Sequence, residues 1–123
     1  MAEASLRGCH ILVVEDEYML ADELQTELED IGATVIGPAG NIDSALDLIR
    51  SAPHLDGAIL DLNLGGAPAF SLADALMTRG VPLVFATGYD FSSVPERFSH
   101  VTRCEKPINI RRITAALGST IQT

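Results

Sequence analysis

The sequence lacks tryptophan and has only two cysteines and one lysine, Lys106, among its 123 residues. Cys9 and Cys104 are not spaced like metal ligands, and they do not suggest a disulfide framework. We interpret both as small buried or half-buried residues of a protein in a reducing, cytoplasmic compartment. The N-terminus has no apolar core of a signal peptide, and the apolar run at residues 11–14 is far too short to span a membrane.

Positive charge is also scarce, because 8 basic residues stand against 17 acidic ones and give a net charge of −9. A nucleic-acid interface needs clustered Lys and Arg, and an anionic membrane surface attracts basic segments. We therefore expect neither nucleic acid nor membrane among the partners. A hydrophobic content of 47% with 20% charged residues is ordinary for a folded domain. The length predicts a single domain over residues 1–123, with its core at about 8–118.

Short apolar segments alternate with segments of helical period. The expected strands are residues 10–14, 34–38, 57–60, 83–86 and 101–104, and three of them are continuously apolar, as in a parallel sheet covered on both faces. Helical patterns follow four of the strands, and Asn41 is the expected cap of the second helix. Between Gly88 and His100 the pattern weakens around Pro95, so we expect a short or unsteady fourth helix there. The alternation predicts a doubly wound α/β sheet with right-handed crossovers.

Polar residues follow four of the expected strands, and ligands of such sheets bind at the carboxyl ends of the strands. They are Glu15, Asp16 and Glu17 after the first strand, Asp61, Leu62 and Asn63 after the third, Thr87, Gly88 and Tyr89 after the fourth, and Glu105, Lys106 and Pro107 after the fifth. Clustered carboxylates form a hard oxygen site that suits Mg²⁺. A carboxylate can also be a nucleophile toward phosphorus, and a lysine and a hydroxyl can bind the transferred group. The pattern therefore indicates phosphoryl-transfer chemistry.

These motifs resemble those of a response-regulator receiver domain over almost the whole chain. The matching stretches are Ile11-Leu12-Val13-Val14-Glu15-Asp16-Glu17, Leu60-Asp61-Leu62-Asn63-Leu64, Phe85-Ala86-Thr87-Gly88-Tyr89 and Lys106-Pro107. The resemblance implies a flavodoxin-like fold with strand order 2-1-3-4-5. It also implies a signalling domain that catalyses only its own phosphorylation and dephosphorylation, and is otherwise not an enzyme. A histidine kinase or a phosphotransfer protein would donate the phosphoryl group, and the output would be contact with an unidentified protein, onward phosphotransfer or a homodimer.

The resemblance also assigns roles to individual residues. Asp61 would accept the phosphoryl group, and Lys106 would contact it. Magnesium ligands would be Glu15, Asp16, Asp61 and the backbone carbonyl of Asn63. The hydroxyl of Thr87 would move to the phosphate, Gly88 would keep access open, and the side chains of Asn63 and Tyr89 would tune hydrolysis. The peptide bond before Pro107 is expected to be cis.

The sequence departs from the family pattern in two places. Arg103 stands where the family usually has an aromatic switch residue, so the usual relay from threonine is in doubt and Tyr89 or Phe91 could take part of its role. Receivers with a Phe-Ala-Thr-Gly-Tyr stretch commonly lack this aromatic, and residues 82–89 resemble that subgroup. The weak fourth helix is the second departure. We expect it to be mobile without phosphate and ordered on activation.

Several alternatives remain open at the level of the sequence. Residues 15–17 could simply cap a helix, Asp61 could cap a loop, residues 87–88 could be only a turn, and Lys106 could be a solvated charge. A flavodoxin-like carrier would need a hydroxyl- and glycine-rich loop where this chain has three acids, and an aspartate phosphatase normally has its nucleophile after the first strand. The main alternative is a pseudo-receiver that binds partners without accepting phosphate.

Overall fold

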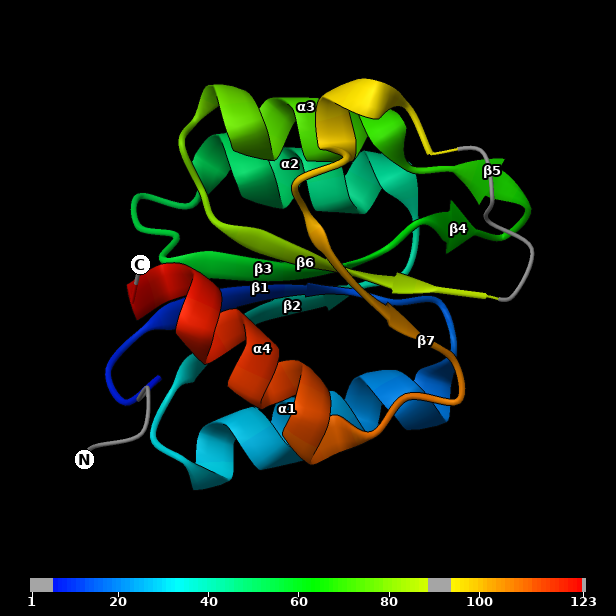
Figure 1. Cartoon of the computed structure of the whole chain (residues 1–123). Coiled ribbons are helices and arrows are strands. Elements are labelled where there is room, and N and C mark those ends of the chain that lie inside the picture. Colours follow the sequence, from blue (N-terminus) through cyan, green and yellow to red (C-terminus); the bar gives the residue numbers. More distant parts are fainter. Residues whose placement is uncertain (1–5, 89–93, 123) are drawn as a thin grey trace.

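The computed structural model describes residues 6–88 and 94–122, which form a three-layer α/β structure (Figure 1). Its main sheet has five parallel strands in the order β2-β1-β3-β6-β7. The strands are β1 (His10–Val14), β2 (Thr34–Ala39), β3 (Gly57–Asp61), β6 (Leu83–Thr87) and β7 (Thr102–Glu105). This arrangement confirms the predicted fold class and the 2-1-3-4-5 order. The three central strands are almost wholly buried, which explains their continuously apolar sequences.

Four helices in the described part of the chain cover the two faces of the sheet. Helices α1 (Tyr18–Asp30) and α4 (Ile110–Gln122) lie on one face, and α2 (Ile42–Ser51) and α3 (Phe70–Thr78) lie on the other (Figure 1). Two separate buried apolar clusters result, one on each side of the sheet. No helix among the residues that the structure describes is long and apolar enough to cross a bilayer.

Local sequence signals set several of the helix ends. The Asn41 side chain accepts a hydrogen bond of 2.8 Å from the backbone N–H of Ser44, as expected of the cap of α2. Helices α1 and α3 end just before Gly32 and Gly80, whose φ angles are +94° and +76°. Glycine adopts this left-handed conformation without steric cost, so it ends the helix and turns the chain back toward the sheet.

The structure adds elements that the sequence patterns did not predict. Strands β4 (Asn63–Leu64) and β5 (Ala67–Pro68) form a small antiparallel hairpin after β3, turned by Gly65 and Gly66 with positive φ angles. Two residues per strand are too few to show a period of two, so no pattern marks them. Helix α4 contains Gly118 in its interior, although glycine is a weak helix former.

The expected fourth helix is replaced, in its described part, by a single 3₁₀ turn, η1 (Glu96–Phe98). Phe98 is 1% exposed and lies against two other aromatic rings, stacked on Phe70 and edge-to-face with Phe85, each at 5.8 Å between ring centroids. This turn is therefore anchored in the core between α3 and β6. The expectation of mobility also falls on residues 89–93, which lie outside the described residues.

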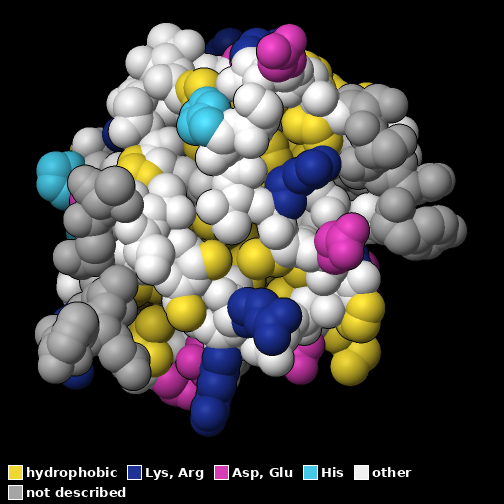
Figure 2. Space-filling model, viewed as in Figure 1, with side chains coloured by type: hydrophobic (Ala, Val, Ile, Leu, Met, Phe, Trp, Pro, Cys, Tyr) yellow, Lys and Arg dark blue, Asp and Glu magenta, His cyan; other side chains and the backbone are white. Residues whose placement is uncertain are grey.

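Charge is unevenly distributed over the molecule. Five of the eight basic residues fall in the short stretch that forms η1, β7 and the start of α4: Arg97, Arg103, Lys106, Arg111 and Arg112. Figure 2 shows this face, on which Lys and Arg side chains lie among hydrophobic ones. Helix α1 instead carries five acidic residues, Asp22, Glu23, Glu27, Glu29 and Asp30.

Candidate functional site

The sheet brings three widely separated charged residues to one edge. Val14 pairs in register with Leu60, and Asp61 pairs with Ala86, so the carboxyl ends of β1, β3 and β6 are level. Glu15 directly follows β1, and Lys106 directly follows β7. Because the strands are parallel, their carboxyl ends form a single rim at which these side chains meet.

The ammonium group of Lys106 lies at the centre of this rim. Its Nζ atom donates hydrogen bonds to Glu17 Oε2 at 2.8 Å, to Asp61 Oδ2 at 3.0 Å and to Glu15 Oε2 at 3.2 Å. The Glu15 and Asp61 side chains are only 1% and 2% exposed, whereas that of Glu17 is 60% exposed. The lysine therefore binds two buried carboxylates from inside the site and one carboxylate at its mouth.

Glu15, Asp16 and Asp61 form an acidic triad whose ligand oxygens all lie within 4.8 Å of one another. Backbone N–H groups hold the three carboxylates in place: Glu17 donates to Glu15 Oε2 at 3.0 Å, Gly65 to Asp16 Oδ2 at 2.8 Å and Asn63 to Asp61 Oδ1 at 3.0 Å. The unpredicted β4–β5 hairpin thus has a clear effect, because its Gly65 turn fixes Asp16.

Burial and neighbouring charges shift the pKa values of two groups in the site. Burial is the main factor that raises the pKa of Glu15 to about 8, and Asp61 raises it further, while the Glu17 N–H and the Lys106 charge oppose the shift. Burial disfavours the charge on Lys106, but Glu17, Asp61 and Glu15 outweigh it and raise the lysine pKa. The Oε1 atom of Glu15 is buried and has no hydrogen-bond partner within the described residues.

This donor set fits a hard divalent cation. Carboxylate and carbonyl oxygens are the ligands that Mg²⁺ prefers in proteins, and an unpartnered carboxylate oxygen at such a site is free to bind it. Glu15, Asp16 and Asp61 could supply the side-chain ligands. A cation there would favour the charged form of Glu15, which burial otherwise disfavours.

The other predicted residues surround this centre. Thr87 ends β6 and is 3% exposed, and its carbonyl accepts a hydrogen bond of 2.8 Å from the backbone N–H of Lys106. Among the residues that the structure describes, a Cβ atom added at Gly88, next to Thr87, would meet no heavy atom within 4 Å. The Lys106–Pro107 peptide bond is cis.

The structure describes Asn63 and Arg103, two of the residues expected to tune hydrolysis or take part in the switch. The Asn63 side chain turns back to its own hairpin, where Oδ1 accepts a hydrogen bond of 2.9 Å from Gly66 N–H. Arg103 is exposed on β7 and pairs in register with Phe85. Tyr89 and Phe91 lie outside the described residues, so their assigned roles stay predictions.

The simplest alternative for residues 15–17 was a helix cap. Glu17 is the residue at the N-cap position of α1, but its side chain forms no capping hydrogen bond. Its carboxylate instead contacts Lys106, and that of Asp16 contacts the hairpin. The sequence patterns did not predict this contact of Glu17. The family resemblance assigned the first two acids of the motif, Glu15 and Asp16, to the metal and gave the third no role.

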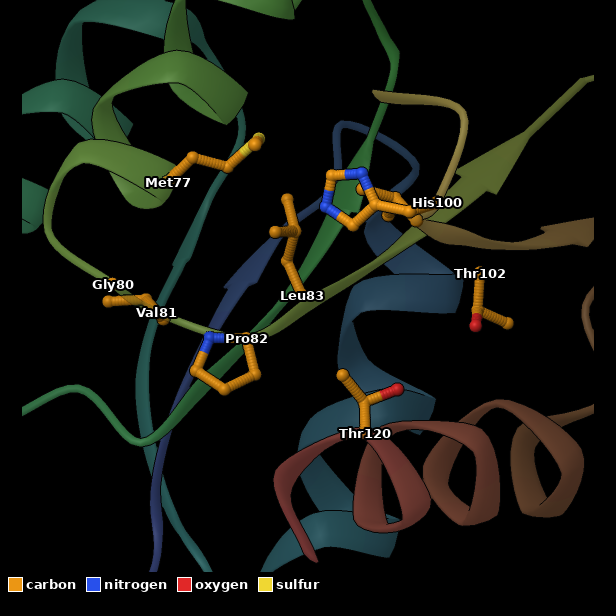
Figure 3. A pocket seen from close by; sticks show the side chains of 9 residues that line it. Met77, Gly80, Val81, Pro82, Leu83, His100, Thr102 and Thr120 are labelled. Atoms are coloured by element: carbon orange, nitrogen blue, oxygen red, sulfur yellow. The ribbon is translucent and has the colours of Figure 1, made fainter. Parts of the chain in front are cut away.

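Two cavities in the described part of the molecule lie at opposite ends of the sheet. One of about 280 Å³ lies beside the acidic triad and is lined by Glu15, Asp16, Tyr18 and Asp22 among others. A second of about 310 Å³ lies at the opposite end of the sheet, between α3, the start of β6 and α4 (Figure 3). Its lining is mainly apolar, with His100 at its rim, and it contains no acidic residue. The first cavity adjoins two acids of the triad, but neither lining includes Asp61 or Lys106.

Comparison with known proteins identifies related chains. The chain matches no protein-family model. It is 29% identical over 119 residues to the phyllosphere-induced regulator PhyR of Methylorubrum extorquens, covering 90% of this chain and 43% of that protein. The chain thus spans less than half the length of this curated relative.

Solved structures extend the comparison. SdrG from Sphingomonas melonis Fr1 is 34% identical, with a TM-score of 0.80 over 94% of this chain and 98% of that one. Its BeF3-activated conformation is also known and matches with a TM-score of 0.70. A response regulator receiver protein from Sinorhizobium medicae WSM419 shares the fold at 21% identity and a TM-score of 0.79, with 97% and 98% of the two chains covered. The fold, the acidic rim and the likeness to SdrG together show that this chain belongs to the response-regulator receiver family, signalling domains that are phospho-acceptors and not classical enzymes.

Proposed function

We propose that Asp61 accepts a phosphoryl group from the phosphohistidine of a sensor histidine kinase or of a phosphotransfer protein. The observation that carries this proposal is the contact of 3.0 Å between Lys106 Nζ and the buried Asp61 Oδ2 within the acidic triad. This contact supplies two things that phosphoryl transfer needs. The Asp61 carboxylate is held in place as a nucleophile, and the Lys106 ammonium group faces the incoming phosphate. The BeF3-activated form of SdrG supports this proposal.

The residues of the chain divide the chemistry among them. An oxygen of Asp61 attacks phosphorus, the P–N bond of the phosphohistidine breaks, and the leaving imidazole takes a proton from water. Hydrolysis later splits the acyl phosphate into the Asp61 carboxylate and inorganic phosphate. Lys106 stabilises the charge on the transferred group. Glu15, Asp16 and Asp61, with the backbone carbonyl of Asn63, would hold Mg²⁺, which when bound offsets the repulsion between carboxylate and phosphate.

The response to phosphorylation is proposed to begin at Thr87. Its position at the buried carboxyl end of β6, the edge of the sheet at which Asp61 lies, supports a hydroxyl that can hydrogen-bond the phosphoryl group. The stretch Phe85-Ala86-Thr87-Gly88-Tyr89 supports the proposed membership in the Phe-Ala-Thr-Gly-Tyr subgroup. The exposed Arg103 supports a switch that does not use the usual aromatic.

The partners follow from the same proposal. The donor is a kinase or phosphotransfer protein, and the output is a phosphorylation-dependent contact with another protein, onward phosphotransfer or a second copy of this chain. The compartment is proposed to be the cytoplasm, which suits two cysteines that are both free thiols. A single receiver domain over residues 1–123 stays a prediction.

The test is covalent labelling of the purified chain. Incubation with Mg²⁺ and a small phosphodonor should add the mass of one phosphoryl group, and hydroxylamine should remove it, as expected of an acyl phosphate. Asp61→Asn should show no adduct. Absence of any adduct, or an adduct that persists in Asp61→Asn, would favour the pseudo-receiver, a module that binds partners without accepting phosphate.

A further inference from the structure

The Glu17 carboxylate accepts a hydrogen bond from the Lys106 ammonium group. The proposed reaction gives this contact no role. We propose that Glu17 is a competing acceptor, which holds Lys106 in the unphosphorylated state and must release it before the lysine can bind a phosphoryl oxygen. This inference rests on the proposed phosphorylation of Asp61. It adds a positioning residue, which acts on the reaction through Lys106.

A count of hydrogen-bond donors leads to this proposal. A lysine ammonium has three N–H donors and no acceptor. The three carboxylates at 2.8, 3.0 and 3.2 Å therefore account for every donor of Lys106. A phosphoryl oxygen on Asp61 can receive a hydrogen bond from this lysine only after one of the three contacts opens.

Burial decides which contact opens. The Glu15 and Asp61 side chains are shielded from water, so water cannot take the place of Lys106 as their hydrogen-bond partner if those bonds break. Glu17 is 60% exposed, and water can replace the lysine as its partner at little cost. Glu17 also lies outside the group of acids that could hold a metal ion. The hydrogen bond between Glu17 and Lys106 is therefore the one that opens.

The competition has a predictable direction and size. Glu17 adds a negative charge at the mouth of the site and takes a donor that the phosphoryl group needs, so both effects weaken phosphoryl binding. Because exposed ion pairs are weak, releasing this one should tighten binding by roughly three- to tenfold. The backbone N–H of Glu17 donates to Glu15 Oε2, and a side-chain substitution leaves that bond in place.

The experiment compares the affinity for BeF3, a phosphoryl analogue, in the presence of saturating Mg²⁺, followed by NMR at the Gly88 amide. Glu17→Gln keeps the size of the side chain and removes its charge. Glu17→Asp keeps the charge but shortens the reach to Lys106. Glu23→Gln is the matched control, because it removes one exposed carboxylate from α1, the helix that begins directly after Glu17. The affinity of each variant for Mg²⁺ alone is measured in parallel.

We expect Glu17→Gln to bind BeF3 roughly three- to tenfold more tightly, Glu17→Asp to change in the same direction, and Glu23→Gln to match the wild type. Affinity for Mg²⁺ alone should change less than affinity for BeF3. Since Lys106 is the single lysine of the chain, its ammonium ¹⁵N signal reports the contact directly and should exchange faster with water in Glu17→Gln.

Several results would overturn the proposal. Unchanged or weaker BeF3 binding by Glu17→Gln would show that the contact does not compete. An equal gain in Glu23→Gln, or wild-type behaviour of Glu17→Asp, would show a general effect of charge. A larger loss of Mg²⁺ affinity than change in BeF3 affinity would make Glu17 a metal ligand. If the wild type and all variants fail to bind BeF3, the proposed phosphorylation falls together with this inference, whereas binding that is equal in all of them overturns this inference alone.

Discussion

The guanidinium of Arg97 in η1 forms two hydrogen bonds of 2.9 Å with the two carboxylate oxygens of Asp74 in α3. The same guanidinium lies 4.5 Å above the ring of the adjacent Phe98. A two-pronged pair of this kind fixes orientation as well as distance. It joins the segment between β6 and β7 to the neighbouring helix at the surface, directly above the aromatic anchor in the core.

The Arg97–Asp74 pair should restrain this segment more than it stabilises the whole domain. Arg97→Ala or Asp74→Asn should speed amide hydrogen exchange at residues 96–101 and leave exchange in β1 and β3 unchanged, because exposed ion pairs add little to global stability. The hydrogen bond to Arg97 lowers the pKa of Asp74, so the restraint is present at neutral pH and is lost as pH falls through that lowered pKa. Uniform acceleration throughout the sheet would contradict this prediction.

Phe98 should matter far more for global stability. Phe98→Ala removes a fully buried ring that contacts Phe70 and Phe85, and such truncations cost about 3–5 kcal/mol. Urea denaturation monitored by circular dichroism measures the loss, with Phe98→Leu expected to lose less and Arg111→Ala, an exposed position on α4, to lose almost nothing. A loss below about 1 kcal/mol in Phe98→Ala would mean that the site collapses without leaving a cavity.

The metal-free protein should become less stable as pH rises toward 8. Burial raises the pKa of Glu15 to about 8 from 4.5, so between these values the folded state holds a proton that the unfolded chain has released. Unfolding then releases this proton, and higher pH favours it, with a slope of at most about 1.4 kcal/mol per pH unit. Above about pH 8 the contribution of Glu15 levels off.

Denaturation in EDTA at a series of pH values tests this, with Glu15→Gln as the reference that removes the titrating group. The difference in stability between wild type and Glu15→Gln should grow in favour of the variant from pH 5 to 8, and Mg²⁺ should reduce it. Parallel curves for the two proteins would show that Glu15 ionises normally in the folded state.

Thr87→Ala should separate phosphorylation from response. The hydroxyl is not needed to form the acyl phosphate on Asp61, so the mass adduct should still appear. Loss of its hydrogen bond to the phosphoryl group should weaken the conformational change, seen as smaller BeF3-induced NMR shifts outside the site. Thr87→Ser retains the hydroxyl and should respond like the wild type. Full shifts in Thr87→Ala would place the switch elsewhere.

The sequence predicted the sheet, its order and the main components of the site, because each rests on a strong local signal. Buried parallel strands are continuously apolar, and the functional residues directly follow them, so the strand pattern also located Asp61 and Lys106. The β4–β5 hairpin was missed because it is too short to show a period. The contact between Glu17 and Lys106 was missed because the direction of a side chain at the mouth of the site leaves no trace in the sequence pattern.

The basic residues from Arg97 to Arg112 and the five acids of α1 lie on different elements, so we expect this small domain to have an electric dipole in addition to its net charge of −9. A dipole exerts torque on an approaching charged molecule before contact, so it affects association rates more than final affinity. Basic and acidic partners would be guided to different surfaces. This guidance should weaken with salt, because the Debye length is only about 8 Å at physiological ionic strength.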